Sequence, residues 1–142
     1  MKVIHIMVMF PVAILLVAGG CSTANTERDR LCTVAFTSND VDMRVDAIEK
    51  LNQMDEPGFG YYQILQDNRI NIPARVEIIK RHYDALTQDQ LKELAGINNI
   101  YEVRKTALLH ITDKKYLLRV SSNKSVDTLA DFAKRLADQL GK

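Results

Sequence analysis

The chain has 142 residues, with 19 Lys and Arg against 18 Asp and Glu, 46% hydrophobic residues and 6% aromatic ones. The balance of charge argues against a nucleic-acid binder, which normally carries a basic face, and the hydrophobic content argues against wholesale disorder. The few aromatic residues disfavour a carbohydrate platform or a single-strand stacking groove, because such sites depend on exposed aromatic faces. One domain of modest size fits this length.

The first 20 residues have the order of a secretory signal peptide. Lys2 is followed by an apolar run over residues 6–18 and then by small residues directly before Cys21, which is the charged start, hydrophobic middle and small-residue end of such a signal. The run is shorter than the roughly 20 residues that a membrane-spanning helix needs, and Pro11 interrupts it. We therefore expect residues 1–20 to be removed, which leaves 122 residues with 18 basic and 18 acidic side chains.

The stretch Ala18-Gly19-Gly20-Cys21 resembles the bacterial lipobox, in which small residues precede an obligatory cysteine. The resemblance implies that lipoprotein signal peptidase recognises Ala18, Gly19 and Gly20, and that Cys21 becomes the lipid-modified N-terminal residue. The family usually has Leu where this chain has Ala18. Several acyl chains hold a protein stably on a membrane. Ser22 after the cysteine is similar to the pattern that sorts lipoproteins to the outer membrane, facing the periplasm, in Gram-negative cells.

Residues 21–30 are polar and small, which is typical of a short tether between a lipid and a folded domain. The alternative to lipid attachment is a secreted protein that is cleaved elsewhere, in which Cys21 pairs with Cys32. Cys32 lies between Leu31 and Val34 on a predicted helix. We therefore expect it to act as a small buried apolar residue.

An internal repeat runs through residues 31–142 and predicts an all-α domain of about four helix pairs. Residues 31–51 align without gaps on residues 91–111, and residues 62–82 fit the same frame. A fourth copy begins near Leu117 and is less regular, as a terminal cap would be. Apolar residues recur at helical spacing inside the copies, and no comparable period-two run appears.

Local signals predict where helices begin inside these copies. Thr87 with Gln90, and Asn99 with Glu102, have the spacing of a capping box, in which the first side chain accepts from the third helical amide. Asn71 is a further candidate cap, because a proline follows it in the first turn, where a missing amide costs nothing. These signals place two helical segments in each copy, separated by a polar break.

The copies resemble the HEAT-like repeats of bacteria, whose second helix opens with an acidic residue, an apolar residue, an arginine and, three places further on, a small residue. The matching residues are Asp42-Met43-Arg44 with Ala47, and Glu102-Val103-Arg104 with Ala107. Pro73-Ala74-Arg75 lacks the acid, and the fourth copy lacks both charges. The resemblance covers roughly residues 27–140 and implies a short, right-handed α/α superhelix.

Arg44, Arg75 and Arg104 occupy one position of the repeat frame. In HEAT-like arrays such an arginine bonds an acid or a carbonyl of the neighbouring repeat, so the resemblance implies a structural role for all three. A basic ladder for an anionic partner is the alternative. For the architecture as a whole, a compact bundle of four to eight helices is the alternative to a superhelix.

The sequence contains no motif typical of catalysis or of a cofactor. His82 and His110 lie on different copies, and Glu77 lies about 140° around the helix from His82, a poor geometry for holding one metal ion. The breaker cluster at residues 55–60 predicts a loop, and Asp55 with Glu56 is the weak candidate pair for a hydrolase. We therefore expect no catalytic residue, no metal, no cofactor and no enzymatic activity.

These features predict a lipid-anchored cell-envelope protein that binds or organises another protein, because stacked helix pairs expose an extended face. One alternative is an envelope inhibitor or immunity-type lipoprotein that neutralises an enzyme or a toxin, which should concentrate acidic or aromatic residues on one face. The other is an unrecognised envelope hydrolase, which should bring carboxylates together in a cleft.

Overall fold

The computed structural model describes residues 22–123 and 127–141. Within these ranges the protein is all-α, with eight α-helices, one short 3-10 helix and no strand. The elements are α1 (Ser22–Thr37), α2 (Val41–Gln53), α3 (Tyr61–Gln66), α4 (Ile72–His82), η1 (Tyr83–Ala85), α5 (Gln88–Leu94), α6 (Tyr101–Leu108), α7 (Lys114–Ser122) and α8 (Ala130–Gln139).

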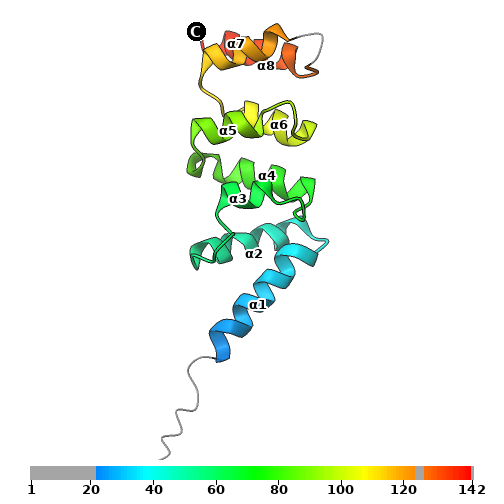
Figure 1. The fold of residues 1–142 in the computed structure, drawn as a ribbon, viewed down its shortest axis with the longest axis vertical. Coiled ribbons are helices and arrows are strands. Elements are labelled where there is room, and N and C mark those ends of the chain that lie inside the picture. Colours follow the sequence, from blue (N-terminus) through cyan, green and yellow to red (C-terminus); the bar gives the residue numbers. More distant parts are fainter. Residues whose placement is uncertain (1–21, 124–126, 142) are drawn as a thin grey trace, which may run out of the picture.

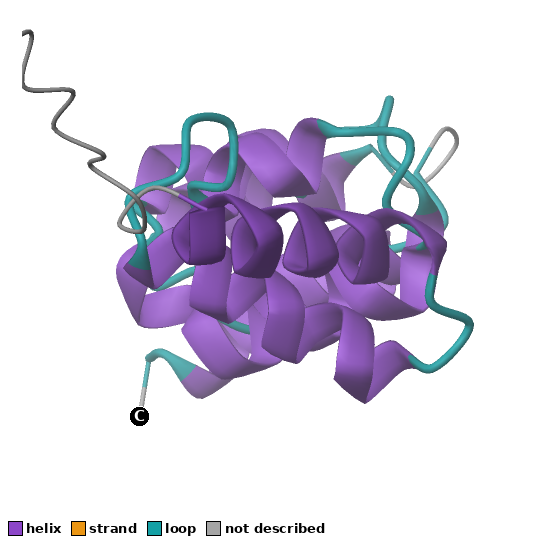
Figure 2. Ribbon diagram, turned by 90° about the horizontal axis from the view of Figure 1, so that it is seen from below, coloured by secondary structure: helices purple, strands orange, loops and turns teal. Residues whose placement is uncertain are grey.

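Consecutive helices pack as four pairs: α1 with α2, α3 with α4, α5 with α6, and α7 with α8. The second helices of the first three pairs also pack on one another, α2 on α4 and α4 on α6. Figure 1 shows the pairs following one another along the longest axis of the molecule, and Figure 2 shows the view along that axis from the α1 side. Each of the three aligned copies therefore corresponds to one helix pair.

Local side-chain chemistry starts two of the helices as the sequence predicts. The Thr87 hydroxyl accepts from the amide of Gln90 at 3.2 Å, and the Gln90 side chain accepts from the amide of Thr87 at 2.9 Å, so the capping box is complete. Asn71 Oδ1 accepts from the amide of Ala74 at 3.0 Å. These bonds satisfy amides that have no partner inside the helix.

The predicted cap at Asn99 is wrong. Helix α6 begins one residue later, after Ile100, which makes no side-chain cap. The Asn99 side chain instead donates through Nδ2 to the carbonyl of Glu93 at 3.0 Å. This bond connects the loop before α6 to the end of α5. The Asn99 side chain therefore binds the preceding helix and does not cap the next one.

The stretch that the sequence predicts as a tether, residues 21–30, also differs. From Ser22 onward it belongs to α1, where Glu27 and Arg30 pair one turn apart at 3.1 Å. Arg28 Nε lies 3.2 Å from Glu56, in the loop after α2. Cys21, like Ala18, Gly19, Gly20 and the rest of the predicted signal peptide, lies outside the described residues.

The predicted loop at residues 55–60 separates the first and second pairs. Two of its residues have left-handed backbone, Asp55 with a φ of 52° and Gly58 with a φ of 87°. Only glycine adopts this conformation without steric cost. The buried side chain in the loop is Phe59, whose ring lies 5.7 Å from that of Phe36 on α1. The loop is therefore held against the core by its own apolar residue.

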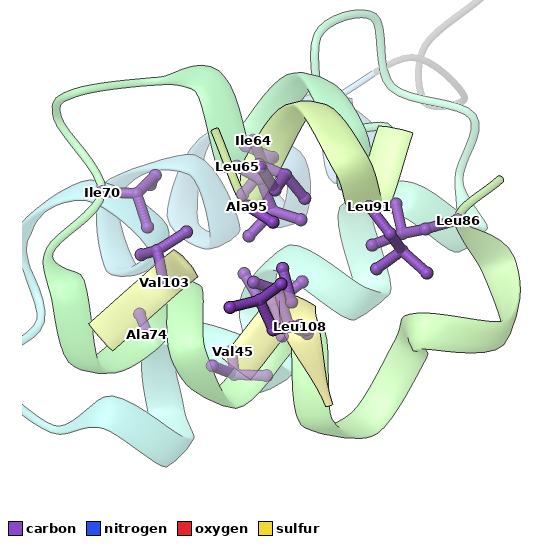
Figure 3. Packing of buried hydrophobic residues seen from close by; sticks show 14 of the residues in the cluster. Val45, Ile64, Leu65, Ile70, Ala74, Leu86, Leu91, Ala95, Val103 and Leu108 are labelled. Atoms are coloured by element: carbon purple, nitrogen blue, oxygen red, sulfur yellow. The ribbon is translucent and has the colours of Figure 1, made fainter. Parts of the chain in front are cut away.

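One apolar core runs through all four pairs. Figure 3 shows part of it, with side chains from the first three pairs directed into a shared interior. Each pair contributes fully buried residues to this core, among them Ile48, Ile78, Leu108 and Ala133. In the described part of the chain, no helix is both long and apolar enough to cross a membrane.

Candidate functional site

The three frame-related arginines are buried, with 5 to 6% of each residue exposed. Arg44 donates to the carbonyl of Ser38 at 3.0 Å, and Arg75 donates to the carbonyls of Ile70 at 2.9 Å and Asp67 at 2.6 Å. These acceptors belong to the loop inside the arginine's own helix pair, whereas the resemblance implied a neighbouring repeat. Burial lowers the pKa of Arg75. Arg44 and Arg75 therefore each stabilise the turn between the two helices of their own pair.

Arg104 alone of the three reaches another pair. Its Nε donates to the carbonyl of Ala95 at 3.3 Å, inside its own pair. Its Nη2 donates to Asp127 Oδ2 at 2.6 Å, just before α8, and the two side chains are only 6% and 7% exposed. Asp127 Oδ1 also accepts from the amide of Leu129. This buried ion pair links the third pair to the fourth.

A polar cluster with four ion pairs is centred on Arg81 and joins α2 to α4. Its guanidinium lies 2.6 Å from Asp42, 3.2 Å from Asp46 and 3.5 Å from Glu49, all on α2, and 2.9 Å from Glu77 on α4. The bond to Arg81 lowers the pKa of Glu77, and the same bond raises the pKa of Arg81. We call these five residues the acidic network.

The acidic network stays open to solvent. The side chains of Asp42 and Asp46 are 77% and 60% exposed, and they lie about one turn apart on α2. One guanidinium carries a single positive charge against four carboxylates, and Lys80 adds a second at 3.6 Å from Glu77. The surface of the first two pairs is therefore negative where α2 meets α4.

The acidic network continues into an aromatic pocket. His82 Nε2 lies 2.8 Å from Glu49 Oε1, and the His82 ring stacks on Tyr61 with 4.2 Å between centroids and 9° between planes. Tyr61 in turn lines an open pocket of about 540 Å³. Burial raises the pKa of Tyr61. The pocket, which we call the tyrosine pocket, is lined by Asn52, Gly60, Tyr61, Tyr62, Gln63, Ala85 and Gln90.

His110 makes a similar stack, here between the third helix pair and the segment that follows the second pair. His110, after α6, lies 3.9 Å from the ring of Tyr83 in η1, with 11° between the planes. Burial lowers the pKa of His110, which favours the neutral ring. The two histidines thus occupy helix ends and face tyrosines of neighbouring elements rather than each other.

The residues considered for chemistry do not converge in the described part of the chain. Asp55 is exposed in the loop, and Glu56 faces Arg28. Cys32 is half-buried on α1, where burial raises the pKa of its thiol, so the reactive thiolate is disfavoured at neutral pH. Among residues 22–123 and 127–141, no group of three His, Cys, Asp or Glu side chains is placed to hold a metal ion.

In comparisons with known proteins, no protein-family model, no curated protein and no solved structure matches the chain. The fold and the site therefore define an all-α protein of packed helix pairs with an acidic and aromatic surface on its first two pairs. The acidic network was not predicted from the sequence. The spacing of Asp42, Asp46 and Glu49 on one helical face was the available signal.

Proposed function

We propose that this chain is a lipid-anchored envelope protein that uses its helix pairs, arranged as a short HEAT-like superhelix, to bind another protein without catalysing a reaction. The observation that carries the binding role is the continuous surface formed by the acidic network and the tyrosine pocket. It combines exposed carboxylates with an open pocket lined by two tyrosines, which suits a basic peptide or protein surface.

The interpretation of the helix pairs as structural repeats is supported by the three frame-related arginines. Each stands at the same place in its copy, each is buried, and each donates to a carbonyl of the turn between its two helices. A shared internal fastening is expected when one supersecondary unit is repeated along a chain. The anchor rests on the residues around Cys21, which resemble the lipobox.

The anchor is tested by the intact mass of the protein extracted from membranes of a producing cell. We expect residues 21–142 carrying acyl-glyceryl chains, and accumulation of the full precursor when lipoprotein signal peptidase is inhibited. Cys21→Ser should abolish both the added mass and the membrane attachment. An unlipidated chain cut at another position, above all one with a Cys21–Cys32 disulfide, would refute the anchor.

The binding surface is tested by cross-linking in the same cells. The double variant Asp42→Lys/Gln63→Arg changes two side chains that face solvent, one in the acidic network and one in the tyrosine pocket. We expect the amount of cross-linked partner to fall by about tenfold or more, which corresponds to a loss of roughly 1.4 kcal/mol of binding free energy. The matched control is Asp138→Lys/Gln139→Arg, the same pair of changes at exposed positions on α8. Equal cross-linking of both variants would place the partner elsewhere.

An envelope inhibitor is the second candidate, because the exposed carboxylates of Asp42 and Asp46 belong to a network that leads through Glu49 and His82 to the tyrosine pocket. This candidate predicts a single tight complex with an enzyme or toxin, in which a basic side chain of the target meets Asp42 and Asp46. Inhibition assays against enzymes recovered in the cross-linking experiment distinguish the two. A scaffold leaves the activity of its partner unchanged, whereas an inhibitor abolishes it.

A further inference from the structure

The first helix pair exposes a position that the next two pairs bury. In the repeat frame Met43 on α2 corresponds to Ala74 on α4 and Val103 on α6. Ala74 and Val103 are 0% and 1% exposed, whereas Met43 is 56% exposed. Helix α4 packs on α2, and α6 packs on α4. The described chain places no earlier pair against α2, so Met43 lies on a packing surface that is left open.

The first helix of the pair shows the same difference. Val34 on α1 corresponds to Leu65 on α3 and Leu94 on α5, which are 1% and 0% exposed, while Val34 is only half-buried. Val34 and Met43 face a groove of about 160 Å³ between α1 and α2. We call it the α1–α2 groove. Apolar residues Leu31, Val34, Met43 and Ala47 line it, with Arg30, Asp46 and Lys50 at its sides.

We propose that the α1–α2 groove is the interface of a homodimer, in which two copies of this chain pack their first helix pairs together around a two-fold axis. The occupant is a second copy because, of the three charged residues that line the groove, Arg30 is paired with Glu27 of its own chain while Asp46 and Lys50 are self-complementary. Asp46 and Lys50 lie one turn apart on α2, so an antiparallel approach brings each Asp46 next to the other copy's Lys50. A two-fold axis makes this contact twice.

The apolar part of the groove supplies the rest of the association. Met43 and Val34 of each copy meet their counterparts, which removes from water the surface that the later pairs bury internally. Methionine suits such a contact because its flexible side chain fills irregular gaps. The dimer does not require the lipid anchor. Asp46 belongs both to the groove and to the acidic network, so Met43→Asp, which leaves the acidic network intact, tests the dimer separately from the proposed function.

The experiment measures the mass of the full-length chain in detergent by light scattering, corrected for bound detergent, over a range of protein concentrations. We expect a monomer–dimer equilibrium that saturates at the dimer. Met43→Asp should raise the dissociation constant by about tenfold or more. The circular dichroism spectrum should stay unchanged, as should the melting temperature at concentrations where both chains are monomeric, because Met43 is exposed in the monomer. Ile97→Asp is the control, since Ile97 is similarly exposed, at 53%, outside the groove.

The charge contact has its own test. Asp46→Lys should weaken the dimer because the lysine introduced at position 46 of each copy then faces Lys50 of the other copy. Asp46→Lys/Lys50→Asp in the same chain should restore it, because opposite signs face each other again. Loss of the bond between Asp46 and Arg81 cannot explain such a rescue. A chain that stays monomeric overturns the proposal. So does a dimer that is indifferent to Met43→Asp, or a mass that grows without limit, as head-to-tail packing on the last pair would give.

Discussion

Replacing Arg104 with methionine is expected to lower the free energy of unfolding by about 3–5 kcal/mol, the usual cost of leaving one partner of a buried ion pair without the other. Asp127 would keep its bond to the amide of Leu129 but would lose the guanidinium at 2.6 Å. Urea denaturation of the full-length chain, followed by circular dichroism, measures the change. A loss below about 1 kcal/mol would contradict the prediction, because it would mean that water or another cation compensates the carboxylate.

Two further variants separate the charge from the packing of the long side chain. Arg104→Met/Asp127→Asn should be more stable than Arg104→Met alone, because asparagine can still accept from the Leu129 amide and carries no charge. Arg44→Met is the matched control, since Arg44 is equally buried but bonds a carbonyl. It should cost only about 1–3 kcal/mol. If Arg44→Met and Arg104→Met have equal effects, the ion pair contributes nothing specific.

Leu108→Ala is expected to cost about 2–5 kcal/mol, since it removes a fully buried side chain and leaves a cavity that the surrounding helices fill only in part. Leu108 lies on α6, whose packing on α4 connects the second and third pairs. Figure 3 shows it in the interior of the labelled cluster. The same denaturation experiment gives the value.

The next residue provides the control for this change. Leu109 is 53% exposed, so Leu109→Ala removes the same atoms from the surface and should alter the free energy of unfolding by no more than about 0.5 kcal/mol. The pair of variants therefore isolates burial from residue type. Similar losses at both positions would mean that Leu109 is covered in solution, for example by a partner or a second copy.

Two of the three helix starts predicted from local side chains are confirmed. The capping box at Thr87 and the cap at Asn71 could be predicted because donor and acceptor are three residues apart along the chain. The same reasoning failed at Asn99, whose side chain could accept from a helical amide or donate to a carbonyl, and where the bond to the Glu93 carbonyl prevails. Residues 22–30 are helical, which their polar composition did not indicate because it is compatible with both a tether and an exposed helical segment.

The candidate surface depended on contacts that no local pattern encodes. Arg81 is 32 to 39 residues from its three partners on α2, and His82 is 33 residues from Glu49. The sequence indicated that Asp42, Asp46 and Glu49 share one face of a helix, because helical periodicity follows from spacing alone. It could not indicate which residue of another helix would face them.

The sequence by itself determined the helical class, the pairing of helices and the alignment of the three arginines, because helix periodicity, caps and breakers act over a few residues. The tertiary structure decided what the aligned positions do. Arg44 and Arg75 bond their own loops, whereas Arg104 also meets Asp127 of the next pair. Met43 is exposed, whereas Ala74 at the equivalent position of the next pair is buried. The physical reason is that burial at an equivalent position depends on which helix packs against it. That packing is decided by the assembled fold and not by the local sequence.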